Sequence, residues 1–203
     1  MATPAVRSDL LLAARAGDGR ALDALCTQWL PVVLRWCQRL GGRGVDADDA
    51  AADVFVRVLD RFDGIRNLNS FDAWIFGVTR RVLAAHRRRA WLRRWVPGVV
   101  ADTNDSAAGP AERAEMSEIS RQVQAALDLL PEEQREVLVL CDVEDRTDVE
   151  VAAMVDVPVG TVKSRLRLAR ARMRREAERL RLGPDQVPAR LSLVRSEAGD
   201  GLD

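Results

Sequence analysis

The chain has 203 residues, of which 47% are hydrophobic and only 4% aromatic, with no Tyr, so it has room for one large or two small aliphatic, helix-rich domains. The formal net charge is zero, but acidic and basic residues lie in separate segments, which indicates both a protein partner and a polyanion. The longest strongly apolar run, Val137 to Cys141, is too short for membrane insertion, and Met1 to Asp9 show no signal peptide, so we expect a cytoplasmic protein.

Helical periodicity dominates from the N-terminus onwards, without convincing strand alternation. Ser8 can cap a first helix that ends near Gly17. A second helix is expected over Ala21 to Leu40, where Pro31 interrupts and kinks it and Gly41 with the next Gly ends it.

The third expected helix carries the acidic segment of the chain. It begins at Asp46 or Asp48 and runs to about Phe62. Six Asp and only two Arg lie between Asp46 and Asp63. Its apolar side is expected to face the core with four residues: Val54, Phe55, Val58 and Leu59.

A polar loop from Asp63 to Asn69 leads to a fourth helix that starts at Ser70. This helix is expected to turn an apolar face inward, formed by Trp74, Ile75, Val78 and Val82. It ends in a basic run from Arg80 to Arg94, which holds seven Arg and His86 but no acidic residue.

A change of composition divides the chain into two small helical domains. Residues 97–110 offer little to bury and predict a flexible linker. We place the domains at 1–96 and 116–182, with a linker at 97–115 and a C-terminal tail at 183–203. In the second domain, one helix is expected over Met116 to Leu130 and another from Pro131 to about Val143.

The next two expected helices form a helix-turn-helix. Thr147 and Glu150 have the spacing of a capping box, so a short helix begins near Asp148 and ends at Val155. Asp156 occupies the turn, where a left-handed conformation is expected. Pro158 then fits the first turn of the following helix.

The last helix has one apolar stripe and a basic surface. At about 100° per residue, five residues fall on that stripe: Val159, Val162, Leu166, Ala169 and Met173. Nine basic residues lie between Lys163 and Arg181, against two Glu. These basic residues can make enough phosphate contacts for strongly salt-dependent binding of a nucleic acid. We therefore expect this helix to lie on nucleic acid.

These motifs, in this order, resemble the extracytoplasmic-function sigma factors of bacterial RNA polymerase, the minimal sigma-70 type with domains 2 and 4. The segment from Leu127 through Arg165 resembles domain 4 nearly throughout. Residues 46–55, followed by Ser70 to Trp74 and the basic helix, resemble domain 2. The ordered pair is more specific than either motif alone.

The resemblance implies a role for each charged segment. The acidic helix would dock on the β′ coiled coil of core polymerase through Asp48, Asp49, Asp53 and Phe55. The −10 element would be bound by the loop and the fourth helix through Asn67, Asn69, Phe71, Trp74, Arg80, Arg81, Arg87 and Arg88, with Trp74 mainly in the core. The −35 element would be bound through Thr161, Lys163, Ser164, Arg165, Arg167 and Arg170.

The resemblance also implies three partners: core RNA polymerase with its β flap, promoter DNA, and an anti-sigma factor.

Several residues depart from the family's pattern. Ala52 stands in place of a common Gln, Arg81 in place of Asn, and Ala85 in place of Asp. Leu168 replaces a usual Arg on the exposed side of the last helix, where it either meets a thymine methyl or stays exposed.

The main functional prediction is therefore a promoter-specificity subunit that initiates transcription, for example in response to stress. One alternative is a stand-alone helix-turn-helix regulator, and another is a protein that titrates polymerase without initiating. We expect no enzymatic activity, cofactor or small-molecule substrate. The sequence shows neither a nucleophile paired with a general base nor a phosphate-binding Gly loop. The three Cys and single His lack metal-ligand spacing, so no metal site is expected.

Overall fold

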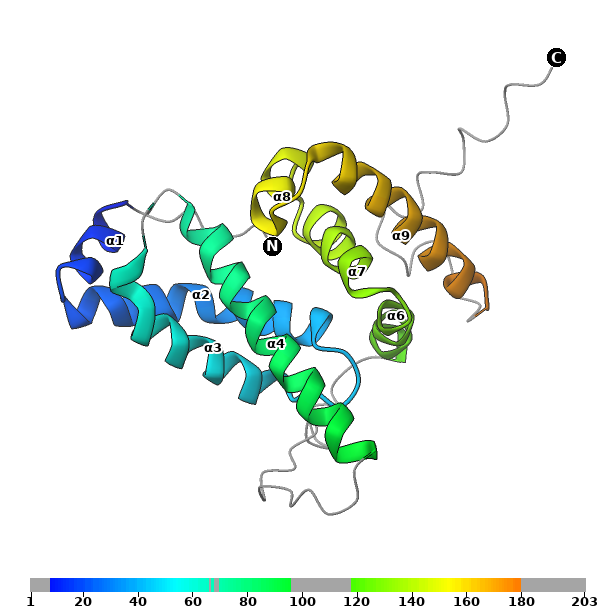
Figure 1. The fold of residues 1–203 in the computed structure, drawn as a ribbon, viewed down its shortest axis with the longest axis horizontal. Helices are drawn as coiled ribbons and strands as arrows, with labels where there is room; N and C mark the ends of the chain where they lie inside the picture. Colours follow the sequence, from blue (N-terminus) through cyan, green and yellow to red (C-terminus); the bar gives the residue numbers. More distant parts are fainter. Residues whose placement is uncertain (1–7, 66, 68–69, 96–117, 180–203) are drawn as a thin grey trace. The chain divides into compact units, whose positions relative to one another are not determined.

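The computed structural model describes residues 8–65, 67, 70–95 and 118–179. Every regular element in these ranges is helical (Figure 1), so the predicted all-α fold class is confirmed. The chain divides into two compact units, which we call the first unit, including residues 8–95, and the second unit, including residues 118–152 and 157–179. The predicted linker at 97–115 and tail at 183–203 lie outside the described residues.

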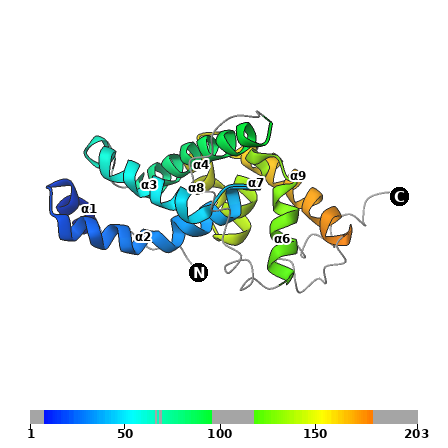
Figure 2. The same ribbon diagram turned by 90° about the horizontal axis from the view of Figure 1, so that it is seen from below.

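The described helices of the first unit follow the order expected from the sequence: α1 (Ser8–Arg15), α2 (Gly19–Leu40), α3 (Ala47–Arg61), the 3₁₀ turn η1 (Phe62–Gly64) and α4 (Phe71–Trp95). Asp18 caps α2 by accepting from the backbone N–H of Arg20 at 2.9 Å. Asp46 caps α3 in the same way, accepting from Asp48 and Asp49 at 2.9 Å each. Helix α2 continues through Pro31 as one element. Helices α2, α3 and α4 pack against one another (Figure 2).

The core of the first unit is built around aromatic rings, although the chain as a whole is poor in them. Trp29 and Trp36 lie seven residues apart on α2, and both are fully buried. Phe71 meets the edge of Trp29 with ring centroids 5.3 Å apart, and Phe76 meets Trp36 at 5.1 Å. These two ring pairs join α2 to α4 and fix which sides of α4 remain at the surface.

One sequence prediction about α3 is wrong. Val54 and Val58 are buried as expected, but Leu59 is 50% exposed. Leu59 lies about 100° further round the helix than Val58, which takes it away from the contacts with α2 and α4. Val56 is exposed as well, at 56%, so α3 carries apolar side chains on its outer face.

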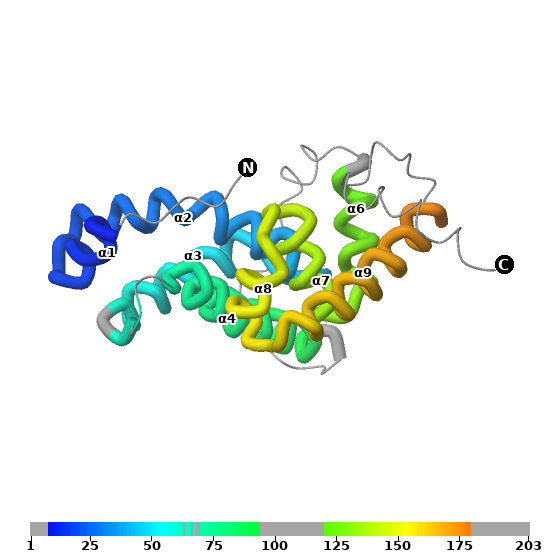
Figure 3. The backbone as a smooth tube through the Cα atoms, turned by 90° about the horizontal axis from the view of Figure 1, so that it is seen from above, coloured from blue at the N-terminus to red at the C-terminus, as the bar shows by residue number. Residues whose placement is uncertain are grey.

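The second half of the chain contains α6 (Glu118–Asp128), α7 (Glu132–Leu138), the π-helical turn η3 (Val139–Val143), α8 (Asp148–Val155) and α9 (Val159–Arg179), all in the second unit except the end of α8. These elements can be followed as a tube in Figure 3, with α7 packed against α9. The helix predicted to run from Pro131 to Val143 therefore changes to π geometry in its last turn. There Glu144 donates its backbone N–H to the carbonyl of Val139 at 3.0 Å.

The predicted capping box and left-handed turn of the helix-turn-helix are confirmed. The Thr147 backbone N–H donates to Glu150 Oε2 at 2.8 Å, and the Glu150 N–H donates to Thr147 Oγ1 at 3.3 Å, which completes the capping box. Asp156 has φ of 56°, the left-handed conformation expected in the turn. Pro158 lies one residue earlier than predicted, just before α9, and its carbonyl accepts from Val162 at 3.2 Å.

Replacing Thr147 by Ala is expected to lower the free energy of unfolding of the second unit by about 1 kcal/mol at neutral pH. Hydrogen bonds from Thr147 hold the pKa of Glu150 below its ordinary value of 4.5. Because this pKa is lower in the folded state, the stabilisation is present above pH 4.5 and is lost as the pH falls through the lowered value.

Urea unfolding followed by far-UV circular dichroism, at about pH 7 and about pH 3, measures this effect. The difference between wild type and Thr147→Ala should shrink at the lower pH. Val149→Ala is the control, since Val149 is 67% exposed on the same turn and should change stability little. An equal loss at both pH values would contradict the proposed contribution of the Glu150 charge.

Candidate functional site

The outer face of α9 presents polar and basic side chains while its apolar stripe is buried. Val162, Leu166, Ala169 and Met173 are at most 6% exposed, and Val159 is half-buried. Lys163, Ser164 and Arg167 are exposed, and Thr161 is half-buried. Burial of the stripe therefore fixes the rotation of α9, and the first two turns offer these polar groups to a ligand.

A shallow hollow of about 310 Å³ lies along this face. Its lining combines four basic side chains spaced as one helical stripe with one carboxylate and one apolar side chain: Lys163, Arg167, Arg170, Arg174, Asp148 and Leu166. A row of four cations on one helix face suits a polyanion better than a small neutral ligand.

Two of the predicted DNA-binding arginines are held by carboxylates inside the second unit. Arg170 donates through Nε and Nη2 to the two oxygens of Asp142, at 3.0 and 2.6 Å, and the Asp142 side chain is fully buried. These hydrogen bonds raise the pKa of the Arg170 guanidinium. Arg165 lies 2.6 Å from Glu133, on the first turn of α7. Both side chains therefore stabilise the placement of α9 in the free chain. Their expected contacts with DNA stay a prediction.

Leu168 is 42% exposed on α9, about 100° round the helix from Arg167. The departure from the family's pattern therefore leaves an apolar side chain at the surface of the free chain. A thymine methyl is the base group that such a side chain can contact in a major groove.

The exposed face of α3 combines carboxylates with apolar side chains. Asp48 and Asp49 are exposed on its first turn, and Phe55 is half-buried. Sequence analysis missed the apolar part of this face, since Ala52, Val56 and Leu59 lie on one exposed stripe. Only the spacing of four and three residues between them could have indicated it.

Asp53, the remaining acidic residue predicted for polymerase contact, is partnered within the first unit. Its Oδ2 lies 2.8 Å from His86 Nε2 and 3.8 Å from Arg89 Nη1, both on α4. The Asp53 side chain keeps 45% of its surface exposed, whereas His86 keeps 14%.

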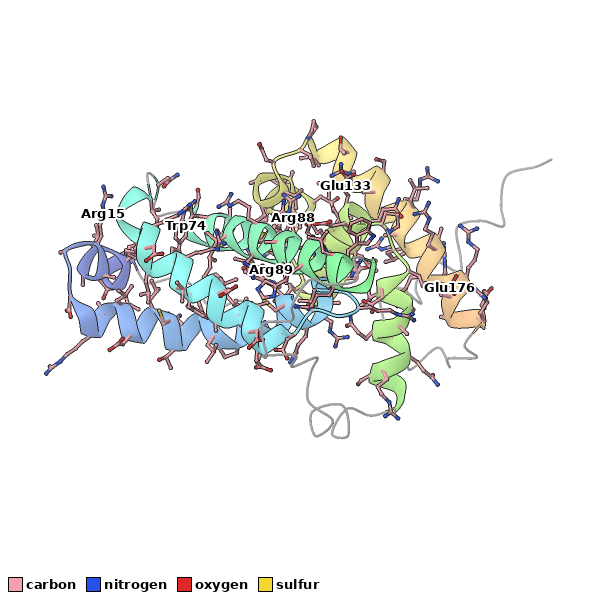
Figure 4. All side chains as sticks on the ribbon, turned by 60° about the horizontal axis from the view of Figure 1, so that its bottom comes forward. Arg15, Trp74, Arg88, Arg89, Glu133 and Glu176 are labelled. Carbon is pink, nitrogen blue, oxygen red and sulfur yellow. The ribbon has the colours of Figure 1, made fainter. Side chains whose placement is uncertain are left out.

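The basic run on α4 is not uniformly available to DNA. Arg87 donates through Nη1 to the carbonyl of Leu40 at 3.1 Å, so it caps the end of α2. Arg81 and Arg88 are exposed and lie seven residues apart on one side of α4, and Arg80 is half-buried. Arg88 and Arg89 are labelled on this helix in Figure 4.

The aromatic and amide groups predicted near the −10 site are placed differently from one another. Phe71 is only 1% exposed inside the aromatic core, so its ring is not available to a base in the free chain. Trp74 is half-buried beside it, with ring centroids 5.8 Å apart. Asn67 is exposed and donates to Ser70 Oγ at 3.2 Å. Asn69 lies outside the described residues.

A further aromatic side chain, Trp91, was missed by the sequence analysis. It is 58% exposed on α4, beyond the basic residues 87–89. An aromatic ring at the surface next to Arg is typical of proteins that stack nucleic-acid bases. Helical projection from the buried Val82 and Leu83 could have found it.

Over the described ranges, no group of three or more His, Cys, Asp or Glu is arranged to hold a metal ion. In the same part of the chain, none of the helices is both long enough and apolar enough to cross a bilayer. The fold and the exposed faces of α9 and α4 define a helix-turn-helix protein with a second, basic helical surface.

Comparison with known proteins identifies the family. The model of sigma-70 region 2 matches residues 25–96, and the model of sigma-70 region 4 matches residues 120–173. The ECF RNA polymerase sigma factor SigE of Mycolicibacterium smegmatis is 33% identical over 165 residues, covering 78% of this chain and 63% of that protein. The RNA polymerase sigma-E factor of Streptomyces avermitilis is 35% identical over 152 residues, covering 72% and 79% respectively.

The chain therefore belongs to the sigma-70 family of RNA polymerase sigma factors, in the extracytoplasmic-function (ECF) group, to which the ECF RNA polymerase sigma factor EcfG of Rhodopseudomonas palustris, 30% identical over 71% of this chain and 78% of that protein, also belongs by name. The match spans less than two thirds of the length of the SigE relative.

Two solved structures share the fold at 24% sequence identity. One is CnrH in complex with the cytosolic domain of CnrY, with a TM-score of 0.62 over 84% of this chain and 96% of that chain. The other is RpoE in complex with the anti-sigma factor NepR from Bartonella quintana, with a TM-score of 0.53 over 75% and 96%.

Proposed function

We propose that this chain directs core RNA polymerase to specific promoters and helps to start transcription there. The observation that carries the proposal is the α9 surface, where burial of the apolar stripe leaves Lys163, Ser164 and Arg167 exposed after a capped α8 and a left-handed turn. This is the arrangement by which a helix-turn-helix offers the start of its second helix to base edges in the major groove. We assign these three residues, with Thr161, to the −35 element.

The first unit supplies the second DNA contact. Arg80, Arg81 and Arg88 on α4 are assigned to phosphates of the −10 element, together with Trp74 and Asn67 near the start of that helix. Arg87 contributes mainly by holding the end of α2. Separate binding of two promoter elements gives specificity that neither helix supplies alone.

The face of α3 is assigned to core polymerase. Asp48 and Asp49 supply charge, and Ala52, Phe55, Val56 and Leu59 supply an apolar area of the kind that protein interfaces bury. The expected partners are the β′ coiled coil for α3, the β flap for the second unit, and an anti-sigma factor that blocks these contacts. The place of action is then the cytoplasm, where polymerase works.

Run-off transcription with purified core polymerase on a genomic promoter library tests the proposal. Wild type should start transcripts at promoters that share −35 and −10 sequences. Lys163→Ala should lower transcription from those promoters about 10- to 100-fold, because one good base contact contributes about 1–3 kcal/mol.

The matched control is Arg175→Ala, which removes one exposed positive charge from the far end of the same helix. It should retain the −35 preference and lose little activity. If wild type binds core polymerase but starts no transcript, a titrating protein is the better description. If wild type binds a promoter tightly without polymerase, a stand-alone regulator is the better description.

A further inference from the structure

The contact between Asp53 and α4 joins the two functional surfaces of the first unit. Asp53 belongs to α3, whose exposed face is assigned to polymerase, and its partners His86 and Arg89 belong to α4, whose basic run is assigned to −10 DNA. Because an ionised carboxylate can only accept hydrogen bonds, His86 Nε2 carries the hydrogen of the 2.8 Å bond.

The two partners of Asp53 differ in how firmly they are held. His86 is 14% exposed at hydrogen-bond distance, whereas Arg89 is 60% exposed and its Nη1 lies 3.8 Å from the carboxylate. An exposed ion pair of this length is weak and is screened by salt. Arg89 is therefore the side chain that moves most readily when the carboxylate gains another donor.

Asp53 is suited to accept such a donor, since 45% of its side chain remains exposed. A carboxylate has about four lone-pair positions, so a polymerase donor can bind it while His86 stays in place. The negative charge that attracts Arg89 is then shared with the new donor, and the Arg89 guanidinium becomes available to a phosphate beside Arg88.

We infer that Asp53, His86 and Arg89 couple polymerase docking to −10 DNA binding: Asp53 offsets part of the charge of Arg89 in the free chain, and docking of polymerase on Asp53 releases Arg89 to the DNA backbone. The coupling is reciprocal, because DNA that captures Arg89 leaves Asp53 more available to polymerase. This inference rests on the proposed function. His86 acts as a positioning residue, which keeps the carboxylate in place between the two helices.

The test measures binding of a fluorescein-labelled, random-sequence single-stranded DNA of about 20 nucleotides to the full chain, alone and in complex with core polymerase. Arg89→Gln should weaken binding by the free chain less than about 2-fold, since Asp53 already offsets part of this charge. In the complex, the same substitution should weaken binding about 3- to 5-fold and lower the salt dependence by about 0.7 in slope.

Asp53→Asn should have opposite effects on the two partners. Affinity for core polymerase should fall, whereas binding of the oligonucleotide by the free chain should rise about 3-fold. Adding Arg89→Gln to Asp53→Asn should abolish this gain, which is the non-additivity that a double-mutant cycle detects. Simple loss of folding would lower both affinities.

The matched control is Asp60→Asn, which removes one exposed carboxylate from the same helix. If Asp60→Asn raises oligonucleotide binding as much as Asp53→Asn does, the gain reflects net charge and the coupling is overturned. The coupling also fails if Arg89→Gln weakens binding equally with and without polymerase. A wild-type chain that binds no core polymerase would instead overturn the proposed function itself.

Discussion

Replacing Trp36 by Ala is expected to lower the free energy of unfolding of the first unit by about 4 kcal/mol. Trp36 of α2 is fully buried against α4, with its ring centroid 5.1 Å from that of Phe76 and 6.1 Å from that of Trp29. The substitution removes this ring contact and leaves a cavity that the packed helices cannot fill completely.

Trp36→Phe should cost much less than Trp36→Ala. Phe keeps an aromatic ring against Phe76, and it removes a buried indole N–H that has no hydrogen-bond partner among the described residues. A buried donor without a partner costs about 1–3 kcal/mol, and its removal offsets part of the lost packing.

Intrinsic fluorescence in a urea titration measures these changes in the first unit, because all five Trp lie between residues 29 and 95. Trp91→Ala is the control, since it truncates an indole that is 58% exposed and should change stability by about 0.5 kcal/mol or less. Equal losses for Trp36→Ala and Trp91→Ala would contradict the placement of Trp36 in the core.

Replacing Arg170 by Met is expected to lower the free energy of unfolding of the second unit by about 3 kcal/mol. Asp142 is fully buried and accepts two hydrogen bonds from Arg170. Without Arg170, the buried carboxylate loses these donors and its burial is left uncompensated. Arg170→Lys should have an intermediate effect, because Lys keeps the charge but cannot form the two-pronged contact.

The double variant Arg170→Met with Asp142→Leu should recover most of this loss, since the buried carboxylate and its partner charge are removed together. Far-UV circular dichroism follows the second unit, while Trp fluorescence should keep its wild-type midpoint because this unit contains no Trp. Recovered stability with an unchanged −35 preference would establish Arg170 as a structural residue. Recovered stability with a lost preference would show that Arg170 also contacts DNA.

Local signals in the sequence predicted most helix ends correctly. Asp46 caps α3, Thr147 and Glu150 form the capping box of α8, and Asp156 takes the left-handed turn. Each of these features involves groups within a few residues of one another along the chain. For the same reason, the apolar stripe of α9 could be assigned from spacing alone.

Partners that are distant in the sequence were not predictable in this way. The pairs Asp53–His86 and Asp142–Arg170 are separated by 33 and 28 residues, and they change the meaning of residues first assigned to polymerase or DNA contact. Leu59 illustrates the same limit, because its exposure depends on where α2 and α4 lie beside α3.

The sequence by itself determined that this is an all-helical chain with a helix-turn-helix and that it carries the ordered motifs of a sigma factor, because helix periodicity, caps and turn residues act over short distances. Only the tertiary structure decided which charged side chains face outward. Lys163 and Arg167 remain exposed, while Arg170, Arg165, Arg87 and Asp53 are paired with groups on other helices. The reason is that an ion pair depends on distances between packed elements, and that packing is set by the rings and aliphatic side chains of the core.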